Sequence, residues 1–378
     1  MATEESTPIP RVGIDATSLL GQPTGVGVFT RELLGALVAR KQVSLRAFAV
    51  SWRRRDELLG LVPEGVEVAQ RAMPARPLKA LWSISERGRI ERFVPGLDVV
   101  HGTNFTVPPS RTAGRVVTVH DLTCVRFPEM CQRDTLKYPA LIKRALKHGA
   151  VVHTPSHYVA NEVCEYFGVG HDRVVAIHSG IPQMAEPDAK GARDILGDTW
   201  PYILSIGTAE PRKDLPGLVA AFDALAEQER DLRLVLVGPQ GWGSGALDQA
   251  LATMRHRDRV VQTGFVSDGI LSALIRGART LAYPSIYEGF GFPPLSAMAA
   301  GVPVVATKAG SLDEILGGAA LMVRVGDTEA LSEALGIAAT DEAQRSILIA
   351  AGTARTQDFS WDLTAASMEQ LYRRVANS

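Results

Sequence analysis

Short β-branched segments alternate with helical patterns along this 378-residue chain, and they limit its fold more than any other feature. Six of these segments precede a break rich in proline and small residues at positions 180–198, and six follow it. The segments are continuous apolar runs, as expected for parallel strands that are covered on both faces. The pattern predicts an α/β fold with two doubly wound, Rossmann-like domains.

The apolar runs predict strands, and the amphipathic patterns between them predict helices. The predicted strands are 11–16, 44–50, 97–102, 115–121, 150–156, 173–179, 202–207, 232–238, 259–265, 281–285, 302–307 and 321–325. The clearest predicted helices are 28–40, a helix that begins near residue 328, and 362–376. A further helix is expected to begin at Ser311, because Ser311-x-x-Glu314 has the pattern of a capping box.

The break at 180–198 marks the expected boundary between the domains. The first domain is assigned residues 1–183 and the second residues 184–358. Ligands of doubly wound sheets bind beyond the carboxyl ends of the strands. Residues that directly follow a strand are therefore the first candidates for function.

Composition and charge argue against several classes of protein. Hydrophobic residues make up 46% of the chain and the formal net charge is −1, so neither disorder nor nucleic-acid binding is indicated. Residues 1–10 lack the pattern of a signal peptide, and no apolar run is long enough to span a bilayer. Cys124, Cys131 and Cys164 have no metal-ligand spacing, so we expect reduced thiols in a cytoplasmic protein.

Two features of the first domain lie at the ends of predicted strands. The turn at 21–27 is rich in glycine and includes Gly25, so the backbone can approach a ligand and the next helix offers N–H groups to an anion. His120 ends a later strand, where an imidazole can contact a sugar hydroxyl or handle a proton. The alternative for the turn at 21–27 is that its glycines serve only the backbone geometry. The alternative for His120 is a structural role. His101 and His153 are less distinctive still.

Arg212 and Lys213 follow the first strand of the second domain. Two adjacent cations at this place can neutralise a diphosphate leaving group without a metal. A cation pair at the start of a helix is electrostatically unfavourable unless an anion lies nearby. A solvated basic pair is the alternative, but the position favours a functional role.

The segment 284–301 is the most informative part of the chain. A strand ends at Ser285, a loop with two glycines and several aromatic residues follows, and Pro293 and Pro294 suit the first turn of a helix. Glu288 is therefore expected in a loop that faces a helix N-terminus. A carboxylate there can hold sugar hydroxyls, while backbone N–H groups hold phosphate or hydroxyl oxygens.

These motifs resemble those of the retaining glycosyltransferases of family 4, which have the GT-B fold with two Rossmann-like domains facing across a cleft. Matching segments occur in family order along nearly the whole chain, and the most specific are EPRK at 210–213 and YEGFGFPP at 287–294. The overall pattern is similar to bacterial mannosyltransferases of polysaccharide assembly. The resemblance implies a first domain that binds a saccharide acceptor and a second that binds a nucleotide-sugar donor. It also implies that residues 359–378 form a helix that crosses back to the first domain.

The resemblance assigns roles to individual residues. Catalytic roles fall to Glu288, His120, Lys213 and Arg212, and donor- or nucleotide-binding roles to Gly25, Val26, Phe265, Val266, Gly289, Phe290, Gly291, Phe292 and Ser296. No metal and no other cofactor is implied, in agreement with the lack of an Asp-x-Asp pair in the sequence. The family instead stabilises the departing diphosphate with protein cations.

Ser296 is a departure from the family pattern. The family has a second glutamate at this position of its Glu-x7-Glu motif, and that glutamate usually binds the ribose hydroxyls. A serine is shorter and uncharged, so we expect at most one weak hydrogen bond to the ribose. Ribose recognition in this chain is therefore expected to depend less on position 296 than it does in family members that have the glutamate.

Several alternatives remain open. Transfer of mannose from GDP-mannose with α configuration is the first interpretation, on resemblance alone. One alternative is a glycosyltransferase that uses another donor, of the UDP- or ADP-glucose type. The others are a sugar-nucleotide epimerase and a carbohydrate-binding protein of the same fold. The stretch 71–93 carries six cations against two carboxylates, which suits an anionic acceptor or peripheral contact with a membrane surface, although a solvated face is the simpler interpretation.

Overall fold

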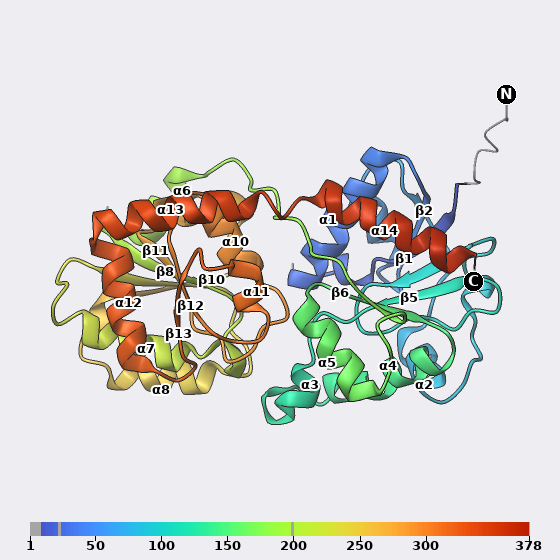
Figure 1. The fold of residues 1–378 in the computed structure, drawn as a ribbon, viewed down its shortest axis with the longest axis horizontal. Coiled ribbons are helices and arrows are strands. Elements are labelled where there is room, and N and C mark those ends of the chain that lie inside the picture. The colour runs from blue at the N-terminus through green and yellow to red at the C-terminus, as the bar shows by residue number, and fades with distance from the viewer. Residues whose placement is uncertain (1–8, 22–23, 198–199, 378) are drawn as a thin grey trace. The chain divides into compact units, whose positions relative to one another are not determined.

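The computed structural model describes residues 9–21, 24–197 and 200–377. The chain divides into two compact units, which we call unit 1 (Met1–Gly180 with Phe359–Ser378) and unit 2 (Ile181–Asp358). Each unit is built around one parallel sheet with helices on both faces (Figure 1). The predicted doubly wound α/β architecture is confirmed.

Unit 1 contains a seven-stranded sheet in the order β3-β2-β1-β4-β5-β6-β7. Its strands are β1 (Arg11–Asp15), β2 (Ser44–Phe48), β3 (Glu67–Val68), β4 (Val99–Gly102), β5 (Gly114–Thr118), β6 (Val151–Thr154) and β7 (Val174–Ala176). The helices α1 (Gly25–Arg40) and α14 (Trp361–Ala376) cover one face, and α2 (Ala75–Ile84), α4 (Tyr138–Lys147) and α5 (His157–Phe167) cover the other (Figure 1). The short α3 (Thr123–Arg126) follows β5.

Unit 2 contains a six-stranded sheet in the order β10-β9-β8-β11-β12-β13. Its strands are β8 (Tyr202–Ile206), β9 (Arg233–Val237), β10 (Val260–Gly264), β11 (Thr280–Tyr283), β12 (Val304–Thr307) and β13 (Leu321–Val323). Its helices are α6 (Ala189–Leu196), α7 (Leu215–Leu225), α8 (Ser244–Thr253), α9 (Asp268–Gly277), α10 (Phe292–Ala299), α11 (Leu312–Leu316), α12 (Thr328–Thr340) and α13 (Glu342–Thr356). The apolar core of α7, α8 and α12 packs on one face of this sheet.

Every predicted strand segment contains a strand, but most of these strands end one to three residues earlier than predicted. The apolar runs continue past the last ladder hydrogen bond, and the sequence does not mark where pairing stops. The strand β3 was not predicted, because two residues are too short to form a recognisable run. Among the described residues, no helix is both long and apolar enough to cross a bilayer.

A buried chain of hydrogen bonds joins α14 to three strands of unit 1. The hydroxyl of Tyr372 lies 2.8 Å from His101 Nδ1, and His101 Nε2 lies 2.7 Å from Thr118 Oγ1. Thr118 Oγ1 lies 2.9 Å from His153 Nδ1, and His153 Nε2 lies 3.2 Å from the carbonyl oxygen of Ile177. All four side chains have no exposed surface.

The carbonyl at the end of this chain fixes the direction of every bond when both histidine rings are neutral. The Ile177 oxygen can only accept, so His153 Nε2 carries a hydrogen and, in a neutral ring, Nδ1 accepts from the Thr118 hydroxyl. Thr118 then accepts from His101 Nε2, and His101 Nδ1 accepts from Tyr372. Burial keeps both histidines neutral at pH 7, and this is the condition under which these directions hold. Burial lowers the pKa of His153 to about 4 and lowers the pKa of His101 well below its usual value of 6.5.

We expect unit 1 to lose stability in mild acid. The unfolded chain binds a proton at His153 near pH 6.5, whereas the folded protein binds it only near pH 4. The stabilisation is therefore complete above the unfolded pKa and is lost progressively as the pH falls through this window. For His153 alone the loss is roughly 3 kcal/mol. Urea unfolding at a series of pH values measures it.

A double Trp200→Phe, Trp242→Phe background restricts the fluorescence signal to the tryptophans of unit 1. The control variant is His153→Gln, which still has a donor for Ile177 but no titrating ring. It should be less stable at neutral pH and should show a shallower fall in acid. Identical acid slopes in the two proteins would show that this histidine does not set the pH dependence.

Candidate active site

The functional residues predicted in the second domain gather at the carboxyl edge of the unit 2 sheet. Arg212 and Lys213 lie in the 3-10 turn η6 (Pro211–Lys213), which follows β8. Glu288 lies in the loop between β11 and α10. Because β8 and β11 are neighbours in the sheet, residues 75 positions apart in the sequence come into contact.

Glu288 accepts a contact from each of the two cations. Its Oε2 lies 2.7 Å from Arg212 Nη1 and its Oε1 lies 2.6 Å from Lys213 Nζ. Arg212 also pairs with Glu210 at 2.7 Å, and Lys213 Nζ donates to the hydroxyl of Tyr283 at 2.7 Å. A cation pair at the start of a helix is favourable only beside an anion, and two carboxylates of the same chain, Glu210 and Glu288, meet this need.

Burial and charge act in opposite directions on this cluster. The side chain of Glu288 is 7% exposed, and burial alone would raise its pKa, but Arg212 and Lys213 lower that pKa to about 2. Burial lowers the pKa of Lys213, and Glu288 partly offsets this effect. Burial also raises the pKa of Tyr283 well above its usual value. At neutral pH the carboxylate of Glu288 is therefore ionised.

The backbone around Glu288 is fixed by a second loop. Gly310 has φ +58°, and a Cβ atom there would lie 2.1 Å from the carbonyl oxygen of Glu288, so only glycine fits. The N–H of Ser311 donates to the same oxygen at 2.9 Å. The predicted capping box at Ser311 is wrong, since the Ser311 hydroxyl donates to the carbonyl of Phe290 and makes no cap hydrogen bond.

The loop after Glu288 leads directly into α10. Gly289, Phe290 and Gly291 are buried, and Gly291 has φ +144° immediately before the helix. Phe292 is the first residue of α10. Its ring meets that of Phe290 edge-on, with the ring centroids 5.3 Å apart. The proline signal was correct, because proline occupies the first turn of this helix.

Three other predicted residues of unit 2 lie outside the ion cluster. Ser296 is on α10 and is 8% exposed. Phe265 and Val266 lie between β10 and α9, and Phe265 is 51% exposed whereas Val266 is 9% exposed. A buried valine beside an exposed aromatic ring can flank a flat ligand at this edge of the sheet.

A pocket of about 240 Å³ lies at the carboxyl ends of β8, β9 and β10. Its apolar walls include four buried side chains, those of Ala209, Leu215, Leu236 and Leu247. Its exposed polar side chains are those of Gln240, Asp248 and Gln262. None of the site residues predicted from the sequence lines this pocket, whose residues come from four separate segments.

His120, Gly25 and Val26 belong to unit 1. His120 follows β5, its Nε2 donates to the carbonyl of Thr103 at 2.8 Å, and burial lowers its pKa. The turn predicted at 21–27 is only partly described, because residues 22–23 lie outside the described part of the chain.

The predicted start of the first helix was wrong. Gly25 and Val26 form the first turn of α1, which begins three residues before the predicted start at 28. The reason is Thr24, whose hydroxyl accepts from the N–H of Gly27 and caps the helix.

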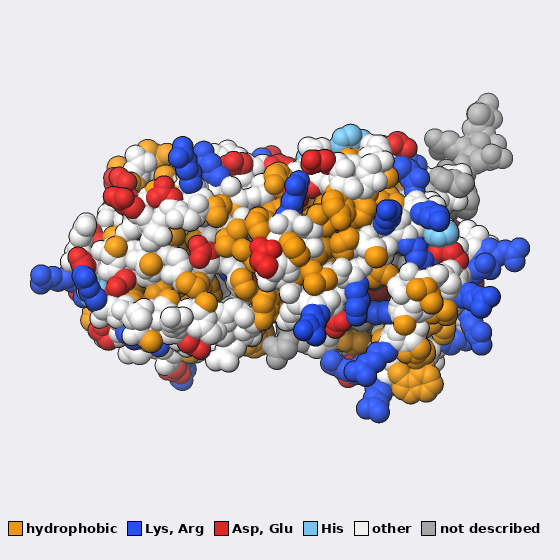
Figure 2. All heavy atoms as spheres, turned by 90° about the horizontal axis from the view of Figure 1, so that it is seen from below, with side chains coloured by type: hydrophobic (Ala, Val, Ile, Leu, Met, Phe, Trp, Pro, Cys, Tyr) orange, Lys and Arg blue, Asp and Glu red, His pale blue; other side chains and the backbone are white. Residues whose placement is uncertain are grey.

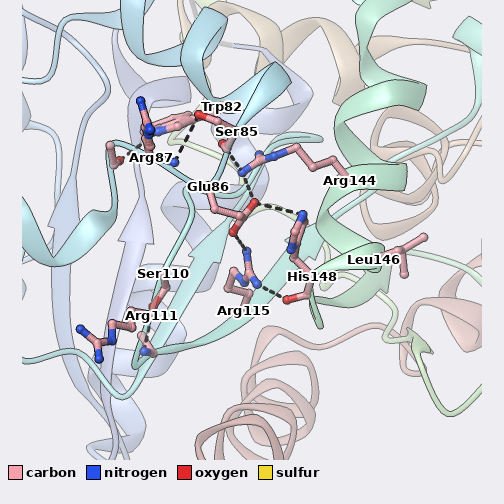
Figure 3. Close-up of polar contacts among 12 residues, drawn as sticks. Trp82, Ser85, Glu86, Arg87, Ser110, Arg111, Arg115, Arg144, Leu146 and His148 are labelled. Carbon is pink, nitrogen blue, oxygen red and sulfur yellow. Dashed lines mark hydrogen bonds and ion pairs between the residues drawn. The ribbon is translucent and has the colours of Figure 1, made fainter.

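The basic stretch at 71–93 has two parts with different surroundings. The carboxylate of Glu86 forms ion pairs with two arginines, Arg115 and Arg144 (Figure 3). Its Oε2 lies 2.8 Å from Arg115 Nη1. Arg76 and Lys79 on α2 are exposed. Figure 2 shows several lysine and arginine side chains on the visible face of unit 1. The ion pairs of Glu86 are structural, and the role of the exposed cations stays a prediction.

Sequence reasoning missed Glu210 and Tyr283 as partners of the cation pair. Tyr283 is the last residue of β11 and is buried, so its position at a strand end was a usable signal. Glu210 immediately precedes the pair in sequence, but nothing in the sequence shows that its side chain turns back to Arg212.

This chain is similar to known glycosyltransferases. Residues 23–183 match the model of Glycosyltransferase Family 4, and residues 200–341 match that of Glycosyl transferases group 1. The O-antigen chain mannosyltransferase B of Escherichia coli is 33% identical over 271 residues, which cover 70% of this chain and 71% of that protein.

Two solved structures have the same fold over nearly the whole chain. Sucrose-phosphate synthase of Thermosynechococcus elongatus has 22% identity and a TM-score of 0.76, with 98% of this chain and 100% of that chain covered. Alr3699/HepE of Anabaena, in complex with UDP and glucose, has 18% identity and a TM-score of 0.73, with 97% and 100% covered. The fold, the motifs and the relatives lead to one conclusion: this chain belongs to the family 4 glycosyltransferases and is a hexosyltransferase with the GT-B fold.

Proposed function

We propose that the enzyme transfers mannose from GDP-mannose to a saccharide acceptor and that the α configuration of the donor is retained. Unit 2 would hold the donor and unit 1 the acceptor. The observation that carries the proposal is the partly buried pair of cations, Arg212 and Lys213, held on Glu288 at the carboxyl edge of the unit 2 sheet. Such cations are placed to meet charge that develops on a leaving diphosphate.

The proposed chemistry needs only groups of this chain and the two substrates. The bond between the sugar and the diphosphate breaks, and the acceptor hydroxyl attacks the same face of the anomeric carbon. The leaving phosphate takes the acceptor proton. Arg212 and Lys213 stabilise the added negative charge, and because they are already held in place they need little reorganisation during the reaction.

The remaining residues have proposed roles around the donor. Glu288 and the N–H groups of the loop 289–292 would hold the sugar. His120 would contact the sugar from unit 1, and the first turn of α1, at Gly25 and Val26, would offer N–H groups to the phosphates. Ser296 would make at most one weak hydrogen bond to the ribose.

The choice of mannose is supported by the Escherichia coli relative, which is named as a mannosyltransferase. A second candidate is a UDP-sugar donor, because the Anabaena protein of the same fold was solved with UDP and glucose. Its identity of 18% supports only the fold, so we place this candidate second.

A donor assay tests the proposal directly. The enzyme is incubated with GDP-mannose, UDP-glucose or ADP-glucose and a panel of mannosides, and the product is examined by NMR. GDP-mannose should be used best and the new linkage should be α. A β linkage formed from an α donor would refute retention, and release of the sugar to water or its epimerisation without acceptor would refute transfer.

Transfer should continue after removal of divalent metal ions. In the proposed mechanism Arg212 and Lys213 neutralise the diphosphate, which is the role that a metal would otherwise have. The rate is measured after dialysis against EDTA, with and without added magnesium or manganese. A loss of turnover that either metal restores would contradict the proposal.

Lys213→Ala should lower kcat by on the order of a hundredfold, because it removes a contact that stabilises the departing diphosphate; such contacts are worth about 3 kcal/mol. Lys190→Ala is a matched control, since Lys190 lies on α6 of the same unit and its side chain is 82% exposed. Ser296→Ala should also change the rate only modestly. A Lys213→Ala enzyme that folds, as judged by its melting temperature, and works within about twofold of the unchanged protein would contradict the role given to this lysine.

A further inference from the structure

We propose that Asp248 selects guanine, by binding the hydrogen-bonding edge of the base in the pocket at the ends of β8, β9 and β10. The inference rests on the proposed function, because it assumes that unit 2 binds a nucleoside diphosphate sugar. It assigns base selection to a residue on α8 that lies outside the recognised motifs.

The pocket has the size and the surfaces that a nucleobase requires. Its volume of about 240 Å³ suits a single ring system rather than a whole nucleotide sugar. Leu215 from α7 and Leu247 from α8 are buried, and with Leu236 from β9 they give it apolar walls. Flat aromatic surfaces are stabilised when such walls remove them from water.

The pocket lies beside the proposed diphosphate site. Gly207, which follows β8, lines the pocket, and a Cβ atom at this position would lie 3.4 Å from Cε of Lys213. The side chain of Lys213 therefore lies close to a residue that lines the pocket, while its ammonium group contacts Glu288. A base in the pocket places its phosphates next to this cation.

Asp248 is available to a ligand. Its side chain is exposed at the pocket, and within the described part of the chain it makes no ion pair or hydrogen bond. Gln240 also lines the pocket and has no hydrogen-bonded partner among the described residues. Gln262, by contrast, accepts from Arg257 at 3.2 Å. The polar side of the pocket thus offers one carboxylate with two acceptor oxygens and one amide.

Guanine matches this pair of groups. Its edge presents two adjacent donors, the ring N–H and the exocyclic amino group, followed by a carbonyl acceptor. A carboxylate takes both donors with charge-assisted bonds, and an amide N–H of a glutamine meets the carbonyl. Adenine and uracil each give such a carboxylate one donor and oppose its second oxygen with a lone pair. The same carboxylate therefore attracts guanine and disfavours the other two bases.

Calorimetry with GDP, IDP, UDP and ADP tests this assignment in the full-length protein. IDP has the ring of GDP without the amino group, so it should bind about ten- to a hundredfold more weakly than GDP. Asp248→Asn should weaken GDP binding by a similar factor, whereas UDP and ADP should bind as well as before or more tightly, because the carboxylate that disfavours their bases is gone. Asp231→Asn is the matched control, because Asp231 is exposed on the same unit just before β9 and does not line the pocket.

Each other outcome has a definite meaning. Unchanged GDP affinity in Asp248→Asn, or an equal loss for all the nucleotides, overturns the role of Asp248 in base selection. If the unchanged protein prefers UDP or ADP and transfers the matching sugar, guanine selection is refuted while glycosyl transfer stands. If it binds none of the nucleotides and transfers no sugar from any donor, the proposed function fails together with the base site.

Discussion

The buried carboxylate of Glu288 determines how the rest of the unit 2 site is arranged. A lone charge at this depth would be strongly unfavourable, and so would the largely buried ammonium group of Lys213. Each charge is tolerated because the other is within 2.6 Å, and Arg212 is held by the same carboxylate at 2.7 Å. The loops after β8 and β11 must therefore meet, and Gly310 and Ser311 keep the backbone of Glu288 in place. The two cations are therefore held in a fixed arrangement by the chain itself.

The sequence predicted the architecture well because parallel strands carry a strong local signal. Each of the longer strands is an apolar, β-branched run between two helical patterns, and both sheets follow from that alternation. Local signals failed where structure depends on distant contacts. The two residues of β3 pair with β2 without any run of their own, and Ser311 hydrogen-bonds to a loop instead of capping its helix. Glycines near residue 25 suggested a turn, whereas Thr24 starts a helix there.

The site was predictable in part for a related reason. Arg212, Lys213 and Glu288 each follow a strand, and the edge of a parallel sheet collects such residues. Their contacts were beyond the sequence, because hydrogen bonding between Lys213 and Tyr283 depends on the order of strands in the sheet. The pocket lined by Asp248 could not be predicted from the sequence either, because it forms only when the ends of neighbouring strands come together. His101 and His153 looked ordinary, since burial and tautomer are properties of the folded unit alone.

The hydrogen bond from Tyr372 to His101 also has a consequence for biosynthesis. Unit 1 is discontinuous: all of unit 2 is translated before the helix that supplies Tyr372 leaves the ribosome. At about 5–20 residues per second, the nascent unit waits on the order of ten to forty seconds. During that time His101 lacks its donor, and the surface that will receive Met368 and Leu371 of α14 stays uncovered. Unit 2 is continuous in sequence and can fold during this interval, so the half of the chain that is synthesised first is the half that is completed last.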